Sequence, residues 1–170
     1  MHGNESVTVS CYQRVPGPVV LIMQTLDSAI AELRSILDSD PLAQLTEADA
    51  AVVASPEHWS RKQILGHLID SAANNHHRFV RAQIEDQLVM PGYAQEAWVR
   101  ANHYQDRAWS DLAALWKSYN LHLGHIMEET PVDRLQAPCR IGDQKPVTLE
   151  FLMVDYVDHM KHHLQQILGR

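Results

Sequence analysis

The sequence contains few cysteines and no long hydrophobic segment, and each absence excludes a class of protein. Among its 170 residues are two cysteines, Cys11 and Cys139, which are far apart and lack Cys-x-x-Cys spacing. This usage suits reduced thiols better than a disulfide framework. No apolar run reaches the roughly 20 residues of a membrane helix, and residues 1–15 contain no hydrophobic signal core. We therefore expect a cytoplasmic protein that has no membrane partner.

Basic residues are also scarce. The chain has 14 Lys and Arg against 21 Asp and Glu, which gives a formal charge of -7, and the basic residues are scattered. A surface that follows a phosphate backbone needs clustered positive charge, so we do not expect nucleic acid as a partner. A composition of 45% hydrophobic and 21% charged residues is ordinary for a globular protein. It predicts one domain over residues 1–170, with 1–16 as an N-terminal extension.

Apolar residues recur at helical spacing in four segments. In chain order these are Val19–Leu37, Ser60 to about Leu88, Trp109–Ile126 and Leu149–Ile167. Short helices are expected after Thr46 and around Gln95–Asn102, and the chain shows no strand pattern. The prediction is an all-α protein built as a four-helix bundle.

Two histidines on the fourth segment stand out. His159 and His163 are four residues apart, so they share one face of a helix, and that face is the apolar stripe. Burying two imidazoles without partners is costly. They either form hydrogen bonds with core hydroxyls or carbonyls, or they bind a metal ion. His67, on the second helix, would supply a third ligand, and three protein ligands are typical of an open, catalytic metal site.

The second helix also carries a polar seam at spacings of three and four, made of His67, Asp70, Ser71, Asn74 and Arg78. The seam indicates either a wet pocket beside the core or a solvated helix edge. In the first case Asp70, Asn74 and Arg78 are candidate catalytic residues. Among the other histidines, His122 borders the stripe of the third helix. It is the best candidate for an additional ligand, although a core histidine with a satisfied hydrogen bond is the competing interpretation.

The ligand positions constrain the topology. His67 lies near the start of its helix, whereas His159 and His163 lie near the end of theirs, so the second and fourth helices must be antiparallel to place all three in one layer. A simple up-down-up-down bundle would make them parallel. The roughly 20 residues between the second and third helices are enough for a crossover that leaves these two helices parallel.

Two motifs resemble those of the DinB/YfiT-like superfamily of metalloenzymes. One is Trp-Ser-x-x-x-Ile-Leu-Gly-His-Leu-x-Asp over residues 59–70, with Arg78 further along; the other is His-x-x-His-His-x-x-Gln-Ile over residues 159–167. The resemblance extends from about the first helix to the C-terminus. It implies a four-helix bundle with a crossover, a divalent ion such as zinc or nickel on His67, His159 and His163, and a homodimer.

The resemblance also implies several activities, and we consider three functions. The first is a metal-dependent S-transferase that transfers a low-molecular-weight thiol to a small electrophile, with Asp70, Asn74 and Arg78 orienting the substrates. The second is a hydrolase that uses a metal-activated water, with Asp70 as general base or as support for His67. The third is a non-enzymatic metal-binding or sensory bundle. The thiol transferase is our first expectation.

Overall fold

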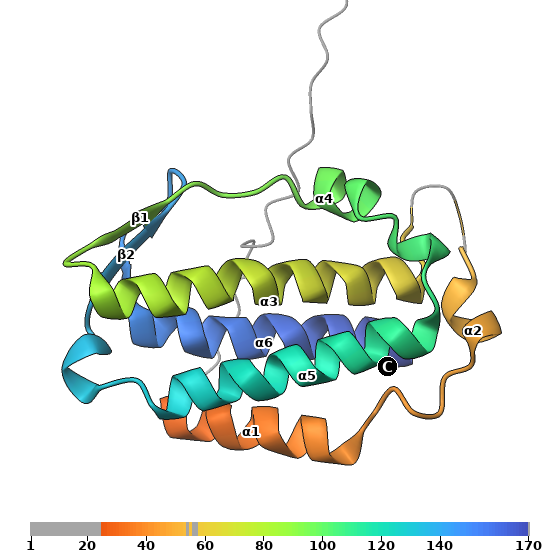
Figure 1. Cartoon of the computed structure of the whole chain (residues 1–170), viewed down its shortest axis with the longest axis horizontal. Helices are drawn as coiled ribbons and strands as arrows, with labels where there is room; N and C mark the ends of the chain where they lie inside the picture. Colours follow the sequence, from red (N-terminus) through yellow and green to blue (C-terminus); the bar gives the residue numbers. More distant parts are fainter. Residues whose placement is uncertain (1–24, 54, 56–57, 170) are drawn as a thin grey trace, which may run out of the picture.

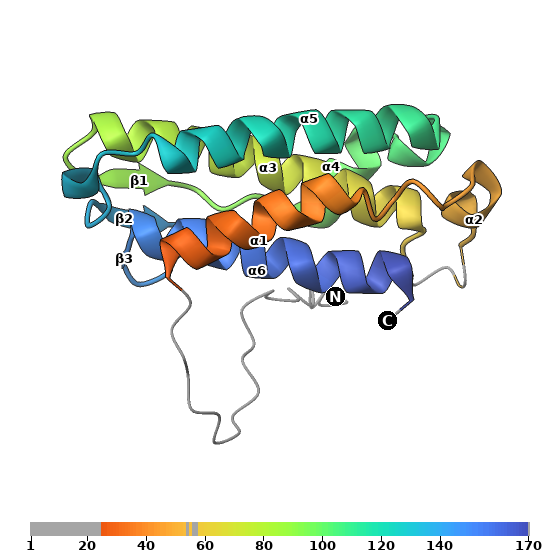
Figure 2. The same cartoon turned by 90° about the horizontal axis from the view of Figure 1, so that it is seen from below.

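Four long helices pack side by side in the computed structural model, which describes residues 25–53, 55 and 58–169 (Figures 1 and 2). The helices are α1 (Leu26–Ser39), α3 (Arg61–Ile84), α5 (Trp109–Glu128) and α6 (Leu149–Leu168). The predicted four-helix bundle is therefore confirmed. No helix in the described ranges combines the length and the apolar character needed to cross a bilayer.

The directions of the helices follow the expected crossover. In Figure 1, α3 and α5 both run from right to left, whereas α1 and α6 run from left to right. The chain between α3 and α5 returns along the length of the bundle through strand β1 (Leu88–Met90), helix α4 (Gln95–Ala101) and a 3-10 turn (Tyr104–Asp106). Because of this return, α6 is antiparallel to α3, as the positions of the histidines required.

The start of α3 is a capping box, a geometry for which a Ser followed three residues later by a Gln, here Ser60 and Gln63, is the sequence signature. The Ser60 side chain accepts a hydrogen bond from the backbone N–H of Gln63, and the Gln63 side chain accepts one from the N–H of Ser60. These two bonds satisfy orphan donors of the first helical turn. The predicted short helices are also present as α2 (Glu47–Ala51), which Thr46 caps, and as α4.

Three short strands correct the expectation that the chain has none. Strand β1 pairs in parallel with β2 (Pro138–Ile141), which pairs antiparallel with β3 (Val147–Thr148). The second helix was predicted to reach about Leu88, but α3 ends at Ile84 and Leu88 is a buried residue of β1. Its apolar side chain extends the helical stripe in sequence, whereas its backbone pairs with Cys139 of β2. Strands of two to four residues are too short to show a period of two.

The first helix also begins later than its apolar stripe indicates. Thr25 has an extended backbone and its side chain accepts a hydrogen bond from the N–H of Ser28, so α1 starts at Leu26. Val19, Ile22 and Met23, which belong to the predicted stripe, lie outside the described residues, as does the proposed extension at 1–16. The Thr25 cap satisfies an N–H group of the first turn, which the helix itself leaves free.

The crossover packs tightly onto α3 at Gly66. A Cβ atom added to Gly66 would lie 2.1 Å from Cδ2 of Tyr104, whose ring is buried against the helix. Glycine is therefore required by this close approach, although it costs about 1 kcal/mol of helix propensity relative to alanine. The contact fixes the crossover one residue away from His67.

Gly66→Ala should destabilise the protein, because the added methyl group displaces the Tyr104 ring. We expect a loss of about 1–3 kcal/mol in the free energy of unfolding, measured by urea denaturation. The matched control is Gly124→Ala in α5, where the nearest atom to an added Cβ is 3.4 Å away. That variant should be neutral or gain up to about 1 kcal/mol. Equal effects of the two substitutions would contradict this account of the crossover.

Candidate metal centre

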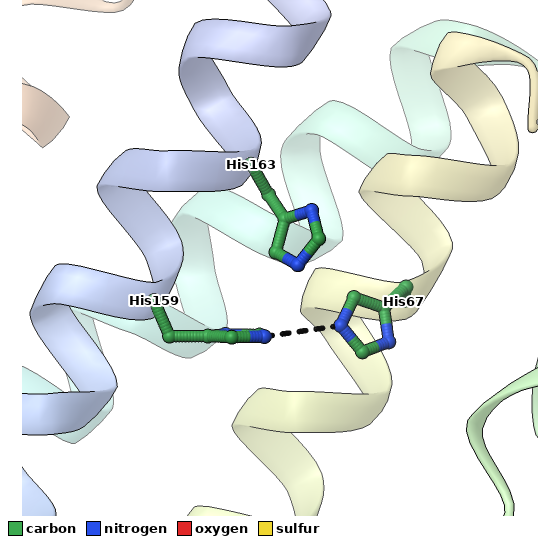
Figure 3. A group of neighbouring side chains, drawn as sticks. All are labelled: His67, His159 and His163. Atoms are coloured by element: carbon green, nitrogen blue, oxygen red, sulfur yellow. Dashed lines mark hydrogen bonds between the residues drawn. The ribbon is translucent and has the colours of Figure 1, made fainter. Parts of the chain in front are cut away.

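Three imidazole rings from two helices converge on one point in the bundle. His67 extends from α3, and His159 and His163 extend from successive turns of α6 (Figure 3). The Nε2 atoms of His67 and His159 are 3.2 Å apart. Ring centroids are separated by 5.1 Å for His67 and His159, 4.8 Å for His67 and His163, and 4.6 Å for His159 and His163. The three histidines selected from the sequence are thus brought together.

The geometry of the cluster suits a small divalent cation. Each histidine offers one ligand atom, and these atoms all lie within 4.8 Å of one another. Two imidazole nitrogens on a tetrahedral zinc ion, each bonded at about 2.0–2.1 Å, lie about 3.3 Å apart. The distance between Nε2 of His67 and Nε2 of His159 already has this value within 0.1–0.2 Å. Imidazole ligands suit zinc, nickel, copper and iron, whereas calcium and magnesium prefer oxygen.

Burial keeps the rings neutral, which is the form that binds metal. His67 is fully buried, and desolvation together with the charge of His163 lowers its pKa to about 4. Desolvation, followed by the charges of His163 and His67, lowers the pKa of His159 to about 3. The pKa of His163 is also lowered, mainly by burial. At neutral pH each ring therefore carries a lone pair without the need to lose a proton.

The outer nitrogens of the rings differ in their partners. Nδ1 of His163 lies 2.9 Å from the side-chain oxygen of Gln166. Nδ1 of His67 and Nδ1 of His159 are buried, and they have no hydrogen-bond partner among the residues that the structure describes. The ring of Trp59 lies 5.5 Å from that of His67, measured between centroids, and is tilted by 43°. Trp59 thus forms an apolar wall beside the buried ligand candidate.

Asp70, one turn after His67, is held by the crossover. Its side chain is 3% exposed, and its Oδ1 accepts hydrogen bonds from the hydroxyl of Tyr104 at 2.7 Å and from the amide of Asn102 at 3.0 Å. Its Oδ2 is buried and has no hydrogen-bond partner in the described part of the chain. Burial raises the pKa of Asp70, and the Tyr104 bond opposes that rise.

The rest of the polar seam leads away from the histidines. Asn74 donates a hydrogen bond to the backbone oxygen of Asp70, and Arg78, 7% exposed, donates one to the side chain of Asn75. At 1.5 Å rise per residue, Asn74 lies about 10 Å and Arg78 about 16 Å along the helix axis from His67. The seam is mostly buried among neighbouring side chains rather than forming a solvated edge. Catalytic roles for Asn74 and Arg78 stay predictions.

His122, the additional ligand considered from the sequence, and the thiol of Cys139 lie apart from the cluster. The ring of His122 lies edge-to-face with that of His76, at 5.1 Å between centroids. His76 in turn forms a hydrogen bond with the hydroxyl of Tyr119. Among the described residues, the metal-type group contains only His67, His159 and His163, so His122 is not part of it. Cys139 is buried in β2, where desolvation raises the pKa of its thiol to about 11. It is therefore a protonated core residue.

Sequence reasoning missed the contacts of Tyr104, Asn102 and Gln166. Tyr104 and Asn102 are more than 30 residues from Asp70 and lie in the 3-10 turn and at the end of α4, so no helical period connects them to Asp70. Gly66 is the local signal of a close neighbour, but it does not identify that neighbour. Gln166 was detectable, because it lies three residues after His163 on the same helix and side chains at that spacing meet.

Two clefts in the described structure lie elsewhere. One, of about 440 Å³, lies between the start of α1 and the end of α5, and its lining includes the ion pair of Arg34 and Glu128. The other, of about 390 Å³, lies between α3 and α5 beside His122 and His125. Neither cleft is lined by His67, His159 or His163.

Comparison with known proteins gives three consistent matches. The sequence model of the DinB superfamily matches residues 22–167. A protein of Halalkalibacterium halodurans named "putative metal-dependent hydrolase" is 24% identical over 123 residues, which cover 72% of this chain and 71% of that protein. The structure of YfiT from Bacillus subtilis, described as a probable metal-dependent hydrolase with an unusual four-helix bundle topology, matches with a TM-score of 0.75 at 20% identity. That match covers 92% of this chain and 91% of YfiT.

The metal-free protein should lose stability as the pH falls below 6.5. Histidine has a pKa of 6.5 in the unfolded chain, whereas His67 and His159 have values of about 4 and about 3 in the folded protein. The unfolded state therefore takes up more protons between pH 6.5 and 4, and stability present above pH 6.5 is lost on acidification. We expect about 2 kcal/mol per histidine to be lost by pH 5.

Urea denaturation in the presence of a chelator measures this dependence at each pH. The double variant His67→Gln and His159→Gln is the control, because it removes both groups, and its stability should fall less over the same interval. Identical profiles for the two proteins would contradict the burial of neutral imidazoles.

Proposed function

The chain belongs to the DinB superfamily, and from this premise we propose that it is a metal-dependent hydrolase with His67, His159 and His163 as the ligands. The observation that carries the proposal is the convergence of three neutral imidazoles without a fourth protein ligand in the described residues. Catalytic zinc sites keep such a position open, whereas structural sites close it with a fourth protein ligand. The names of the two relatives support hydrolysis over thiol transfer, which was our first expectation from the motifs.

We propose zinc or nickel as the ion, since imidazole ligands suit both. When bound, a divalent ion on three neutral imidazoles supplies a Lewis acid that lowers the pKa of a water molecule towards neutrality. The chain's own contribution is to hold the three rings in place, to keep them neutral at pH 7, and to enclose His67 beside Trp59 and the buried face of α3. No ligand needs to be deprotonated before the ion binds.

Asp70 is the residue of this site best suited to hold a proton. Its carboxyl group is on the same helix as His67 and one turn away, and two hydrogen bonds from the crossover fix its orientation. Burial raises its pKa, which brings a carboxylate closer to the range in which a general base works at neutral pH. We assign to Asp70 proton transfer during hydrolysis.

Thiol transfer uses the same three histidines with a different nucleophile. An open coordination position that activates water also accepts a small thiol as thiolate. The two functions therefore differ in substrate rather than in ligands, and they can be separated by assay. A non-enzymatic bundle and a homodimer also stay predictions.

The purified protein should bind one zinc or nickel ion per chain, as measured by mass spectrometry of metal content after dialysis. His67→Ala and His163→Ala should each reduce occupancy to below about a tenth, because losing one of three ligands should weaken binding at least as much as the 10–100-fold loss typical of residues that only orient a ligand. His77→Ala, at an exposed histidine outside the cluster, is the control and should retain full occupancy. Full occupancy in both ligand variants would refute the three-histidine site.

The zinc-loaded protein should hydrolyse at least one member of a panel of chromogenic esters, amides and phosphoesters. Asp70→Asn should lower kcat by about 10²–10⁴, the usual contribution of a general base, while the metal content stays full. A parallel assay follows the reaction of glutathione or cysteine with monobromobimane. Metal-dependent thiol consumption without any hydrolysis would decide for the transferase and against the proposed function.

A further inference from the structure

Gln166, on the last turns of α6, bridges the candidate ligand His163 and the exposed His162. Its side-chain oxygen lies 2.9 Å from Nδ1 of His163, and its side-chain nitrogen lies 3.0 Å from Nε2 of His162. The amide therefore contacts two imidazoles on the same helix, three and four residues before it. We propose that Gln166 is a positioning residue that keeps the proton of His163 on Nδ1 and so leaves the Nε2 lone pair for a metal ion. The role of Gln166 in catalysis depends on the hydrolase function proposed above. The experiments below measure metal affinity and the position of the His163 proton, so they do not depend on hydrolysis.

The tautomer follows from the chemistry of the amide. A neutral imidazole has one N–H and one lone pair, and an amide oxygen only accepts hydrogen bonds. Nδ1 of His163 must therefore be the donor in its bond to Gln166, and Nε2 must carry the lone pair. Figure 3 shows one nitrogen of the His163 ring turned towards the gap between His67 and His159 and the other turned away. The nitrogen left without a proton, Nε2, is therefore the one that faces the other two candidate ligands.

His162 gives the amide its direction. The amide nitrogen of Gln166 only donates, so it matches a lone pair on Nε2 of His162. The opposite orientation would place the amide N–H groups against Nδ1 of His163 and would require the proton of that ring on Nε2, where it would block an ion. His162 is exposed, and its ring lies 5.2 Å from that of His163, measured between centroids. It thus acquires a role through its contact with Gln166.

The three candidate ligands differ in whether their outer nitrogen, Nδ1, forms a hydrogen bond. In the described residues, Nδ1 of His67 and Nδ1 of His159 have no hydrogen-bond partner, whereas Nδ1 of His163 has Gln166. Residues that orient metal-bound histidines through the outer nitrogen are typically worth 10–100-fold in metal affinity. Removal of the Gln166 side chain should therefore weaken metal binding mainly through His163.

Two measurements on the full-length protein test the proposal. The affinity for Zn²⁺ is measured by competition with a chromophoric chelator for the wild type, Gln166→Leu, Gln166→Glu and the matched control Gln165→Leu. Gln165 is exposed and adjacent on the same helix, but it is not bonded to His163 in the described structure. Independently, the nitrogen shifts of His163 in metal-free, ¹⁵N-histidine-labelled protein show which ring nitrogen carries the proton. The signals are assigned by their absence in His163→Gln.

We expect Gln166→Leu to bind Zn²⁺ 10–100-fold more weakly and Gln165→Leu to remain within twofold of the wild type. Gln166→Glu should retain the affinity, because a carboxylate also accepts from Nδ1. The proton of His163 should be on Nδ1 in the wild type and shared between both nitrogens in Gln166→Leu.

A wild-type ring that carries its proton on Nε2 would overturn the proposal. So would equal affinities of the two leucine variants, or a weaker affinity of Gln166→Leu with unchanged protonation of His163, which would mean that Gln166 acts through helix structure. If the wild type bound no metal, the hydrolase function would fail, and the position of the proton would still decide the role of Gln166.

Discussion

The candidate site depends on the burial of uncharged imidazoles where α3 and α6 pack against each other. His67 is completely enclosed, and its Nε2 lies 3.2 Å from Nε2 of His159. Two neutral rings in this contact satisfy each other only if one donates and the other accepts. In the tautomer proposed for His163, a third nitrogen without a proton faces them. Polar groups removed from water need partners, and a cation satisfies all three nitrogens at once. The same packing of α3 against α6 that stabilises the bundle therefore also buries the three nitrogens and creates their need for a shared partner.

The crossover between α3 and α5 allows α3 and α6 to pack in the antiparallel direction that brings the three histidines together. In a bundle of alternating helices α6 would run parallel to α3, a helix of 24 residues and about 36 Å, and the early His67 would lie far from the late His159 and His163. The return of the chain through α4 reverses this relation (Figure 1). The same segment presses Tyr104 against Gly66 and binds Asp70 through Tyr104 and Asn102. The connection between α3 and α5 therefore determines both the direction of α6 and the surroundings of His67.

Periodic features could be predicted from the sequence, whereas contacts that depend on loops could not. The spacing of His159 and His163, the capping box at Ser60 and the direction of α6 all follow from helix geometry. The end of α3 was misplaced because Leu88 continues an apolar stripe while its backbone pairs with Cys139. The bonds from Tyr104 and Asn102 to Asp70 depend on how the crossover folds back, and no period in the sequence encodes that path.

The central prediction is that a single cation binds between α3 and α6. Anomalous diffraction from crystals of the zinc-loaded protein, recorded on both sides of the zinc absorption edge, tests it most directly. We predict one strong peak per chain, about 2.0–2.1 Å from nitrogens of His67, His159 and His163, with a non-protein atom in the remaining position. A zinc peak at any other place, with these three rings unchanged and in contact only with one another, would contradict the claim.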